Sequence, residues 1–229
     1  MSFALSFLTL WLTLPSAHAL MGGHPIHESD APSLVYIEEL GCSGVIIAPN
    51  TLLTAAHCFY PGAEESGRSS MLGVRPIDLH PGTGITLIRN EESTEGSRPH
   101  TGSYEVLNSA SHPSYESALR DGVAREQGLD IAVIRFRDST SHRAPSLNAI
   151  ASPLTTGRLA PGRAIHLAGF GCQSPEEFHS GSRSQESRMG TLPLLAEGPQ
   201  LISLNARGAG TERALVCPGD SGGPAFVSG

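Results

Sequence analysis

The stretch CPGDSGGPAFVSG, residues 217–229, places Ser221 among glycines and directly after an aspartate, Asp220. Glycine adopts positive φ angles readily, so such a loop turns tightly and points consecutive backbone N–H groups at one spot. A serine in that loop attacks a carbonyl carbon while amides of the same loop stabilise the oxyanion that forms. The stretch therefore indicates a nucleophilic serine.

A nucleophilic serine needs a base, usually a histidine, and the histidine needs a carboxylate that fixes its tautomer. LLTAAHCF (52–59) offers His57, and GLDIAVIRF (128–136) offers Asp130. Taken alone, a histidine at a strand end is by default a structural or surface residue, and an aspartate such as Asp130 is also found as a turn residue that ends a loop. GDSGG formally matches the G-x-S-x-G elbow of α/β-hydrolases, but that fold places its acid and histidine after the serine. No His, Asp or Glu follows Ser221 in this sequence, so the order His57, Asp130, Ser221 is the one that fits.

The composition excludes several other kinds of chemistry. All 15 basic residues are arginine, so a Ser-Lys hydrolase, a Schiff-base enzyme and a P-loop are excluded, because each needs a lysine amine. A net charge of -7 argues against a nucleic-acid partner. A chain of 229 residues that is 39% hydrophobic can bury a core, and its 26 glycines and 17 prolines suit short strands joined by many turns.

Short apolar segments bounded by turn residues predict an all-β chain. The predicted strands are residues 33–40, 42–48, 51–56, 84–89, 130–136, 164–171, 191–195, 200–205 and 224–228. Several are continuous hydrophobic runs, as expected for strands in a closed or two-faced core. ESALRDGVAREQ (116–127) predicts one short helix with a glycine in its middle. Residues 60–105 and 173–190 are polar and are interpreted as solvated surface loops.

An apolar run at residues 3–14 is too short for a transmembrane helix, which needs about 20 residues. Ala17-His18-Ala19 fits signal-peptidase cleavage after Ala19, although no Lys or Arg precedes the run. The alternative is a buried N-terminal segment. We expect residues 1–19 to be a signal peptide and the product to be secreted, either extracellular or periplasmic.

With TAAHC, DIAV and GDSGGP present in this order, the chain resembles the chymotrypsin-like (trypsin-like) serine proteases from about Leu20 onward. The resemblance implies an all-β fold of two antiparallel β-barrels, with the first barrel in residues 20–137, a linker in 138–162 and the second in 163–229. The last strands and the C-terminal helix of that family have no counterpart here. We therefore expect a second barrel that is incomplete and a chain that is truncated at its C-terminus.

The resemblance also implies roles for single residues. His57 would be the general base and then acid, Asp130 its orienting carboxylate, and Ser221 the nucleophile. The oxyanion hole would be the backbone N–H groups of Gly219 and Ser221. A freed α-amino group at Leu20, in LMGG, would form a buried ion pair with Asp220, and signal peptidase itself would create that amine.

The base of the family's specificity pocket corresponds to Leu215. A leucine cannot pair with a cation, so the pocket would favour apolar or small side chains; Leu215 as an ordinary core residue is the equal alternative. The four cysteines are Cys42, Cys58, Cys172 and Cys217. Cys42 and Cys58 resemble the family's disulfide behind the catalytic histidine. Cys172 follows GFG, a counterpart of a family turn near the nucleophile, and either pairs with Cys217 or leaves two free thiols.

These inferences predict a serine endopeptidase that acts through an acyl-enzyme, with no cofactor and no metal, because the cysteine spacing contains no CxxC pair. The expected partners are protein or peptide substrates and protein protease inhibitors, with no nucleic acid, no membrane after signal cleavage, and a monomeric state. The alternative is a non-catalytic binding or decoy protein on the protease fold. A secreted metal-binding protein, suggested by His24 and His27, is the weaker third hypothesis.

Overall fold

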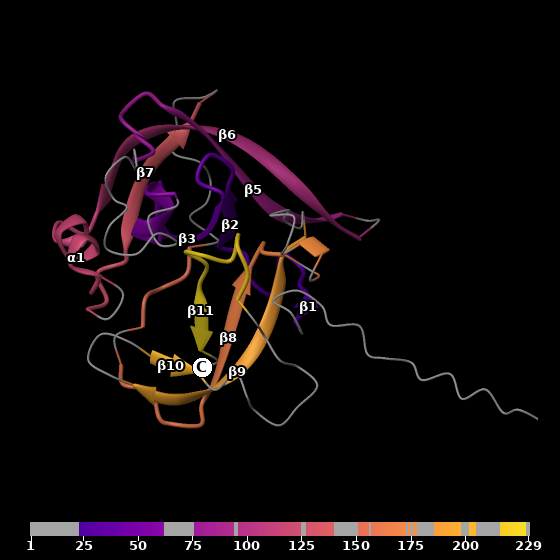
Figure 1. Cartoon of the computed structure of the whole chain (residues 1–229). Helices are drawn as coiled ribbons and strands as arrows, with labels where there is room; N and C mark the ends of the chain where they lie inside the picture. The colour runs from indigo at the N-terminus through magenta and orange to yellow at the C-terminus, as the bar shows by residue number, and fades with distance from the viewer. Residues whose placement is uncertain are drawn as a thin grey trace, which may run out of the picture.

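The computed structural model describes residues 23–61, 76–93, 96–124, 127–139, 151–155, 157–172, 174, 176–177, 186–197, 202–204 and 216–227. Over these residues the chain is mostly β-structure, arranged as two sheets (Figure 1). The strands are β1 (His24–Pro25), β2 (Leu34–Ile37), β3 (Cys42–Ala48), β4 (Thr51–Thr54), β5 (Gly84–Ser93), β6 (Gly96–Ser111), β7 (Ala132–Asp138), β8 (Ala164–Gly169), β9 (Arg188–Glu197), β10 (Ile202–Leu204) and β11 (Ala225–Val227). The helices are η1 (Ala56–Phe59), a 3₁₀ turn, and α1 (Tyr115–Asp121).

The first sheet closes into a barrel with the strand order β2-β3-β4-β7-β6-β5, in which β5 pairs with β2. All four residues of β2 are buried because the strand has apolar neighbours on both faces. Val35 and Ile37 belong to the barrel core, whereas Leu34 and Tyr36 belong to a second cluster between the sheets. Side chains alternate across a strand, so a strand between two cores reads as a continuous hydrophobic run.

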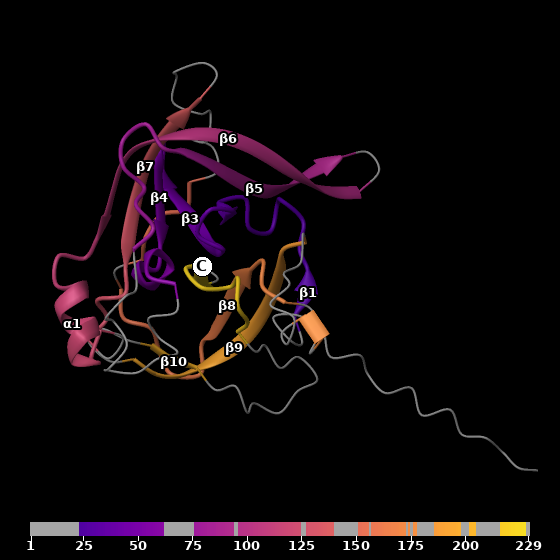
Figure 2. The same ribbon diagram turned by 45° about the horizontal axis from the view of Figure 1, so that its top comes forward.

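The strands β5 and β6 form a long antiparallel hairpin, paired from Gly84 with Glu105 to Ser93 with Gly96. Its far end extends away from the rest of the barrel (Figures 1 and 2). The predicted strand at residues 84–89 is confirmed as the start of β5, but the interpretation of 60–105 as surface loop was wrong for the rest of the hairpin, residues 90–93 and 96–105. Ile85 and Leu87 face the core, but many of the other hairpin residues are polar, and those whose burial is described are mostly partly or fully exposed, so the hairpin lacks an apolar pattern along its length.

The helix α1 begins one residue before the predicted segment 116–127 and ends well inside it. Tyr115 and Ala118 are its buried residues and pack on the barrel core. Gly122 ends the helix in the left-handed conformation, with φ of 73°, and its N–H reaches the last turn's carbonyl groups. No helix in the described part of the chain is long and apolar enough to cross a membrane.

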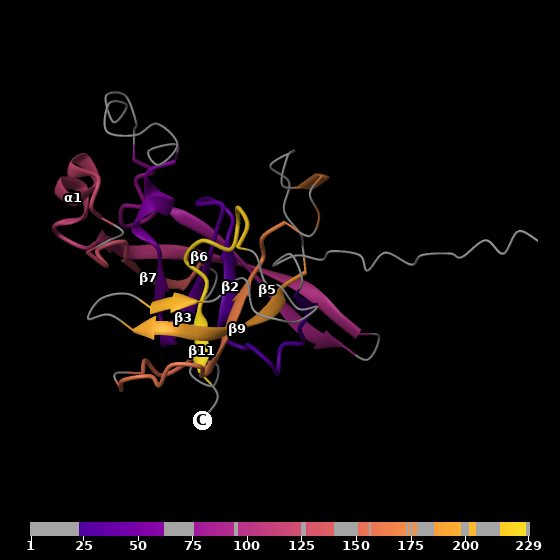
Figure 3. The same ribbon diagram turned by 60° about the horizontal axis from the view of Figure 1, so that its bottom comes forward.

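The second sheet has the order β1-β9-β8-β11, with β10 paired to β9, and it is open over the described residues. Figure 1 shows β11, β8 and β9 side by side, and Figure 3 shows β9 and β11 of the same sheet from below. The four predicted strands after residue 162 correspond to β8, β9, β10 and β11. The loop interpretation of residues 173–190 was wrong at its end, because β9 already begins at Arg188, which is buried.

The two sheets pack against each other through aromatic side chains. Tyr36 of β2 meets Phe170, just after β8, with ring centroids 5.9 Å apart. In the part of the expected linker that is described, Ser152 donates its N–H to the carbonyl of Ile46, so this segment lies along the first barrel. Its hydroxyl is 2.6 Å from that of Ser33, which is fully buried.

Candidate active site

His57 and Asp130 come together because of strand register in the first barrel. The strands β4 and β7 are antiparallel, and Thr54 at the end of β4 pairs with Ala132 at the start of β7. His57 follows β4 in the short helix η1, and Asp130 precedes β7, so both residues lie at the same end of the strand pair. Antiparallel pairing fixes which residues are neighbours, so the barrel brings these two side chains together.

The Asp130 carboxylate holds His57 at two points. One oxygen, Oδ1, accepts the backbone N–H of His57 at 2.8 Å, and the other, Oδ2, lies 2.7 Å from the ring atom Nδ1. An ionised carboxylate only accepts hydrogen bonds, so Nδ1 carries a proton and donates it. In the neutral imidazole Nε2 is then the unprotonated nitrogen, whose lone pair can accept a proton, which is the arrangement that a general base requires.

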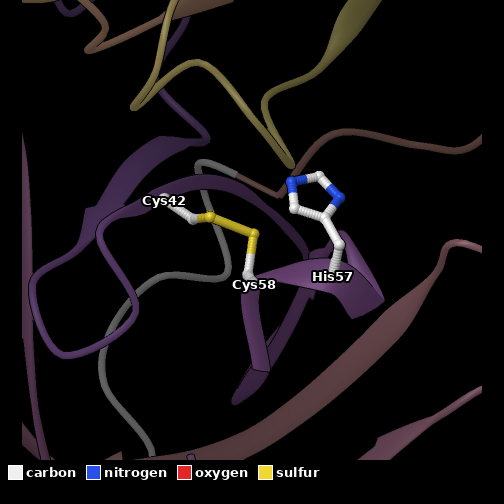
Figure 4. Close-up of side chains that lie close together, drawn as sticks. All are labelled: Cys42, His57 and Cys58. Atoms are coloured by element: carbon white, nitrogen blue, oxygen red, sulfur yellow. A yellow bond between two sulfur atoms is a disulfide. The ribbon is translucent and has the colours of Figure 1, made fainter. Parts of the chain in front are cut away.

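A disulfide between Cys42 and Cys58 lies beside the histidine (Figure 4). It ties η1, which carries His57, to the first residue of β3. The two sulfur atoms and a ring nitrogen of His57 lie within 4.8 Å of one another, a spacing that also suits a metal ion. Both sulfurs are engaged in the disulfide, however, and metal binding needs thiolates.

The loop that carries Ser221 turns tightly between the two sheets. Gly219 and Gly222 have φ angles of 98° and 78°, which only glycine adopts without strain. Asp220 donates its N–H to the carbonyl of Cys217, and Gly223 donates to the carbonyl of Asp220. A Cβ atom on Gly222 would overlap Thr54 Oγ1 of β4, so the loop packs closely against the first barrel.

Asp220 is 7% exposed, and its carboxylate points into the second sheet rather than toward His57. Its oxygens accept the backbone N–H groups of Gly171, at 2.8 Å, and Cys217, at 2.9 Å. Burial raises the pKa of Asp220 to about 6, and the two hydrogen bonds oppose that rise. A Cβ atom on Gly169 or Gly171 would overlap the carboxylate, so these glycines make room for it. The disulfide Cys172–Cys217 joins the segment after β8 to the start of the loop.

One cleft of about 990 Å³ has His57, Asp130 and Ser221 in its wall. A second, smaller hollow of about 370 Å³ also has His57 and Ser221 in its wall, together with Gly219 and the Cys42–Cys58 disulfide. The histidine and the serine therefore lie where the two hollows meet.

Two residues predicted from the sequence, Leu20 and Leu215, lie outside the described residues. Two buried polar residues that the sequence analysis did not single out hold distant segments together, and one of them, Ser43, contacts the site. Ser43 of β3 bonds to the Ser221 loop, and Arg188 of β9 donates to the carbonyl of Gly23 at 2.8 Å. Neither residue belongs to a local sequence motif, because each forms its hydrogen bond with a segment far away in the sequence.

Comparisons with known proteins agree with this geometry. A family model described as Trypsin matches residues 20–229. A trypsin of Saccharopolyspora erythraea is 25% identical over 224 residues, which cover 91% of this chain and 82% of that protein. Trypsin alpha of Drosophila erecta is 28% identical over 224 residues, which cover 92% of this chain and 73% of that protein.

Among solved structures, a mutant of human heparin binding protein matches with a TM-score of 0.58 and 20% identity, over 91% of this chain and 80% of that chain. Human heparin binding protein itself matches with a TM-score of 0.56 and 18% identity, over the same shares of the two chains. At such identities the likeness concerns the fold alone. Together with the closed first barrel, it confirms the all-β chymotrypsin-type fold expected from the sequence.

Proposed function

The chain belongs to the trypsin family of serine proteases, and from that membership we propose that it is a secreted serine endopeptidase that cleaves peptide bonds through an acyl-enzyme on Ser221. The observation that carries the proposal is the geometry of His57. Its Nδ1 is held by Asp130 at 2.7 Å, and it shares the wall of one cleft with Ser221. This leaves Nε2 as the nitrogen that serves the serine.

In the proposed reaction, Ser221 Oγ attacks the scissile carbonyl carbon while His57 Nε2 takes the hydroxyl proton. The electron pair of the carbonyl moves onto its oxygen, and the N–H groups of Gly219 and Ser221 stabilise that oxyanion. His57 then gives the proton to the leaving amine, and the amine departs. Asp130 keeps its charge throughout and stabilises the imidazolium that forms between the two proton transfers.

The acyl-enzyme is hydrolysed by an equivalent pair of steps, in which water is the nucleophile and Ser221 Oγ is the leaving group. His57 takes a proton from water, the resulting hydroxide bonds to the acyl carbon, and the oxyanion forms again at the same two amides. His57 then returns a proton to Ser221 Oγ as the ester bond breaks. The carboxylate product leaves with the free enzyme restored, so the chemistry needs no cofactor.

The activating ion pair between the Leu20 amine and Asp220 belongs to the same proposal. Asp220 supports it because its carboxylate is buried and is satisfied, within the described residues, by two backbone N–H groups. Burying an ionised carboxylate costs free energy even when backbone N–H groups bond to it. A positively charged α-amino group beside it would offset that cost. Cleavage after Ala19 would release this amine at Leu20.

The proposed preference for apolar or small side chains rests on Leu215 as the base of the specificity pocket. The wall of the described cleft supports an apolar preference on other grounds. Ile131, Leu154 and Val216 line it, and they are exposed by 40%, 62% and 62% of their surface. Exposed apolar side chains in the wall of this cleft favour substrates with apolar side chains, because binding such a substrate removes both apolar surfaces from water.

The test is labelling by a fluorophosphonate probe. The protein is expressed with its proposed leader, purified after export and then exposed to the probe. The expected result is one label per chain, on the peptide that contains Ser221, and none on Ser221→Ala. A folded, soluble chain that takes up no label at Ser221 would contradict the enzymatic proposal. That result would favour the alternative, a non-catalytic binding or decoy protein on the same fold.

A further inference from the structure

The side chain of Ser43 lies fully buried at the point where three segments meet. It belongs to β3 of the first barrel, and its exposed fraction is 0%. Its hydroxyl donates to the carbonyl oxygen of Gly219 at 2.6 Å and accepts the backbone N–H of Phe170 at 3.1 Å. One hydroxyl thus joins the first barrel, the Ser221 loop and the segment after β8.

The direction of the hydroxyl hydrogen follows from these two contacts. A serine hydroxyl has one hydrogen, and its oxygen accepts from the N–H of Phe170. The hydrogen is therefore directed at the carbonyl of Gly219. Two bonded neighbours fix the rotamer of Ser43, so the hydroxyl is a fixed donor rather than a rotating one.

The hydrogen bond from Ser43 restrains a residue, Gly219, whose backbone is more mobile than that of other residue types. Its φ is 98°, and a glycine moves between backbone conformations at little cost because it has no Cβ atom. A change at Gly219 turns the peptide planes on both of its sides, and one of them carries the N–H proposed for the oxyanion hole. Anchoring its carbonyl oxygen to Ser43 restricts that movement.

The backbone of Ser43 supports the same loop from behind. Its carbonyl oxygen accepts the hydroxyl of Thr54 at 2.8 Å, and a Cβ atom on Gly222 would approach both of these groups. The loop therefore rests on β3 on either side of Ser221: Gly219 is held by the side chain of Ser43, and Gly222 packs against its backbone.

We propose that Ser43 is a positioning residue, which holds Gly219 so that its N–H points at the oxyanion formed on the substrate. This inference rests on the proposed function, because it assigns Ser43 a part in that same reaction. Ser43 touches neither the substrate nor the reacting atoms; it acts through Gly219. An oxyanion bonds to its donors most strongly in the transition state, so displacing one donor slows the chemical step more than it weakens substrate binding.

The test compares three variants of the exported protein. Ser43→Ala removes the hydroxyl, and Ser43→Cys replaces it by a thiol that donates weakly. Ser33→Ala is the matched control, because Ser33 is also fully buried and hydrogen-bonded through its hydroxyl but contacts Ser152 instead of the loop. The readouts are the rate constant of fluorophosphonate labelling, kcat and KM on a fluorogenic casein, and amide hydrogen exchange of Phe170 and of residues 216–224.

We expect Ser43→Ala to lower the labelling rate and kcat by about 10- to 100-fold, less than the loss of a whole oxyanion donor, with KM nearly unchanged. Ser43→Cys falls between Ser43→Ala and the unsubstituted chain, and Ser33→Ala stays within about twofold, as a substitution away from the loop should. Hydrogen exchange at Phe170 and in the loop rises in Ser43→Ala, rises less in Ser43→Cys, and does not rise in Ser33→Ala. Equal losses of rate in Ser43→Ala and Ser33→Ala, or an unchanged rate in Ser43→Ala, would overturn the inference.

The two proposals fail in distinguishable ways. If the unsubstituted chain takes no label, the proposed function fails, and hydrogen exchange then decides the role of Ser43 by itself. Faster exchange of the loop in Ser43→Ala, absent from Ser33→Ala, supports a positioning role even then. Identical exchange in the two variants contradicts it.

Discussion

The first barrel and the second sheet contribute to the site in different ways. The barrel closes on itself, and the register of β4 with β7 alone brings His57 to Asp130. The second sheet is open over the described residues. The loop that carries Ser221 is held there by a disulfide, by glycines with positive φ, and by Ser43 of the other sheet.

This difference means that the proposed base and nucleophile depend on different interactions. The base depends on strand pairing within one closed unit, which is cooperative and has a continuous core. The nucleophile depends on contacts between segments that are far apart in the sequence. Substitution of Asp130, which orients His57, should therefore alter chemistry with little effect on folding, whereas substitution of the buried Asp220 should alter both.

The largest expected effect is on the base. We expect Asp130→Asn to lower the fluorophosphonate labelling rate by about 10⁴-fold, with the free energy of unfolding changed by less than about 1 kcal/mol. An asparagine amide can donate to Nδ1, which places the ring proton on Nε2 and removes the lone pair that accepts the serine proton. Asp121→Asn, at the exposed end of α1, is the matched control. Equal labelling of Asp130→Asn and the unsubstituted chain would contradict the assignment.

The two disulfides allow a direct comparison of the two regions by urea unfolding. Cys172–Cys217 spans 45 residues, and Cys42–Cys58 spans 16. From the chain entropy of the unfolded state, replacing both cysteines by alanine should cost about 4 kcal/mol for the longer loop and about 3 kcal/mol for the shorter one. A larger loss for the Cys42–Cys58 pair would show that the second sheet depends on its disulfide less than we infer.

In a chain that still carries the proposed leader, residues 1–19, we expect Asp220 to give the second sheet a distinctive pH dependence. Its pKa is raised from 3.8 to about 6, so the folded state favours the protonated carboxyl. The folded chain then binds more protons than the unfolded one between about pH 4 and 6, and the free energy of unfolding falls by about 2–3 kcal/mol as the pH rises through that window. Asp220→Asn should lack this fall in urea titrations at each pH.

The same urea titrations on the chain that begins at Leu20 test the proposed ion pair. An α-amino group of Leu20 paired with Asp220 favours the charged carboxylate, so the fall between pH 4 and 6 should disappear once the leader is removed. Identical pH profiles for the precursor and the processed chain would contradict the proposed ion pair.

The smallest expected effect concerns the helix beside the first barrel. Gly122 has φ of 73°, and alanine is strained there, so Gly122→Ala should lower the free energy of unfolding by about 1 kcal/mol and leave labelling unchanged. Gly157→Ala is the control, because a Cβ atom there meets nothing within 4 Å. A change in labelling rate in Gly122→Ala would connect α1 to the site in a way that the strand register does not explain.

Much of the molecule follows from local patterns in the sequence. Apolar runs between turn residues predicted five strands of the first barrel, all but β6, and the four strands after residue 162, because burial of alternate or successive side chains leaves a visible period. The stretches around His57, Asp130 and Ser221 predicted a shared site, and the structure puts all three in one cleft. Their catalytic roles stay predictions, as do those of Leu20 and Leu215.

Other features have no local pattern from which to predict them. The strand β6 is largely polar, and its pairing with β5 depends on backbone hydrogen bonds that any residue can make. Ser43 reads as one small residue in an apolar strand, and its contact with Gly219 joins residues that are 176 positions apart. Such a bond exists only once the two sheets have packed, so it belongs to the tertiary structure.

The central claim is that this chain cleaves peptide bonds with Ser221, and identification of new amino termini tests it most directly. The exported protein is incubated with a denatured protein mixture, and the new termini are mapped by mass spectrometry beside a Ser221→Ala control. We predict cleavage after apolar or small residues by the unsubstituted chain and none by Ser221→Ala. New termini that are absent from both samples, or equally present in both, would contradict the claim.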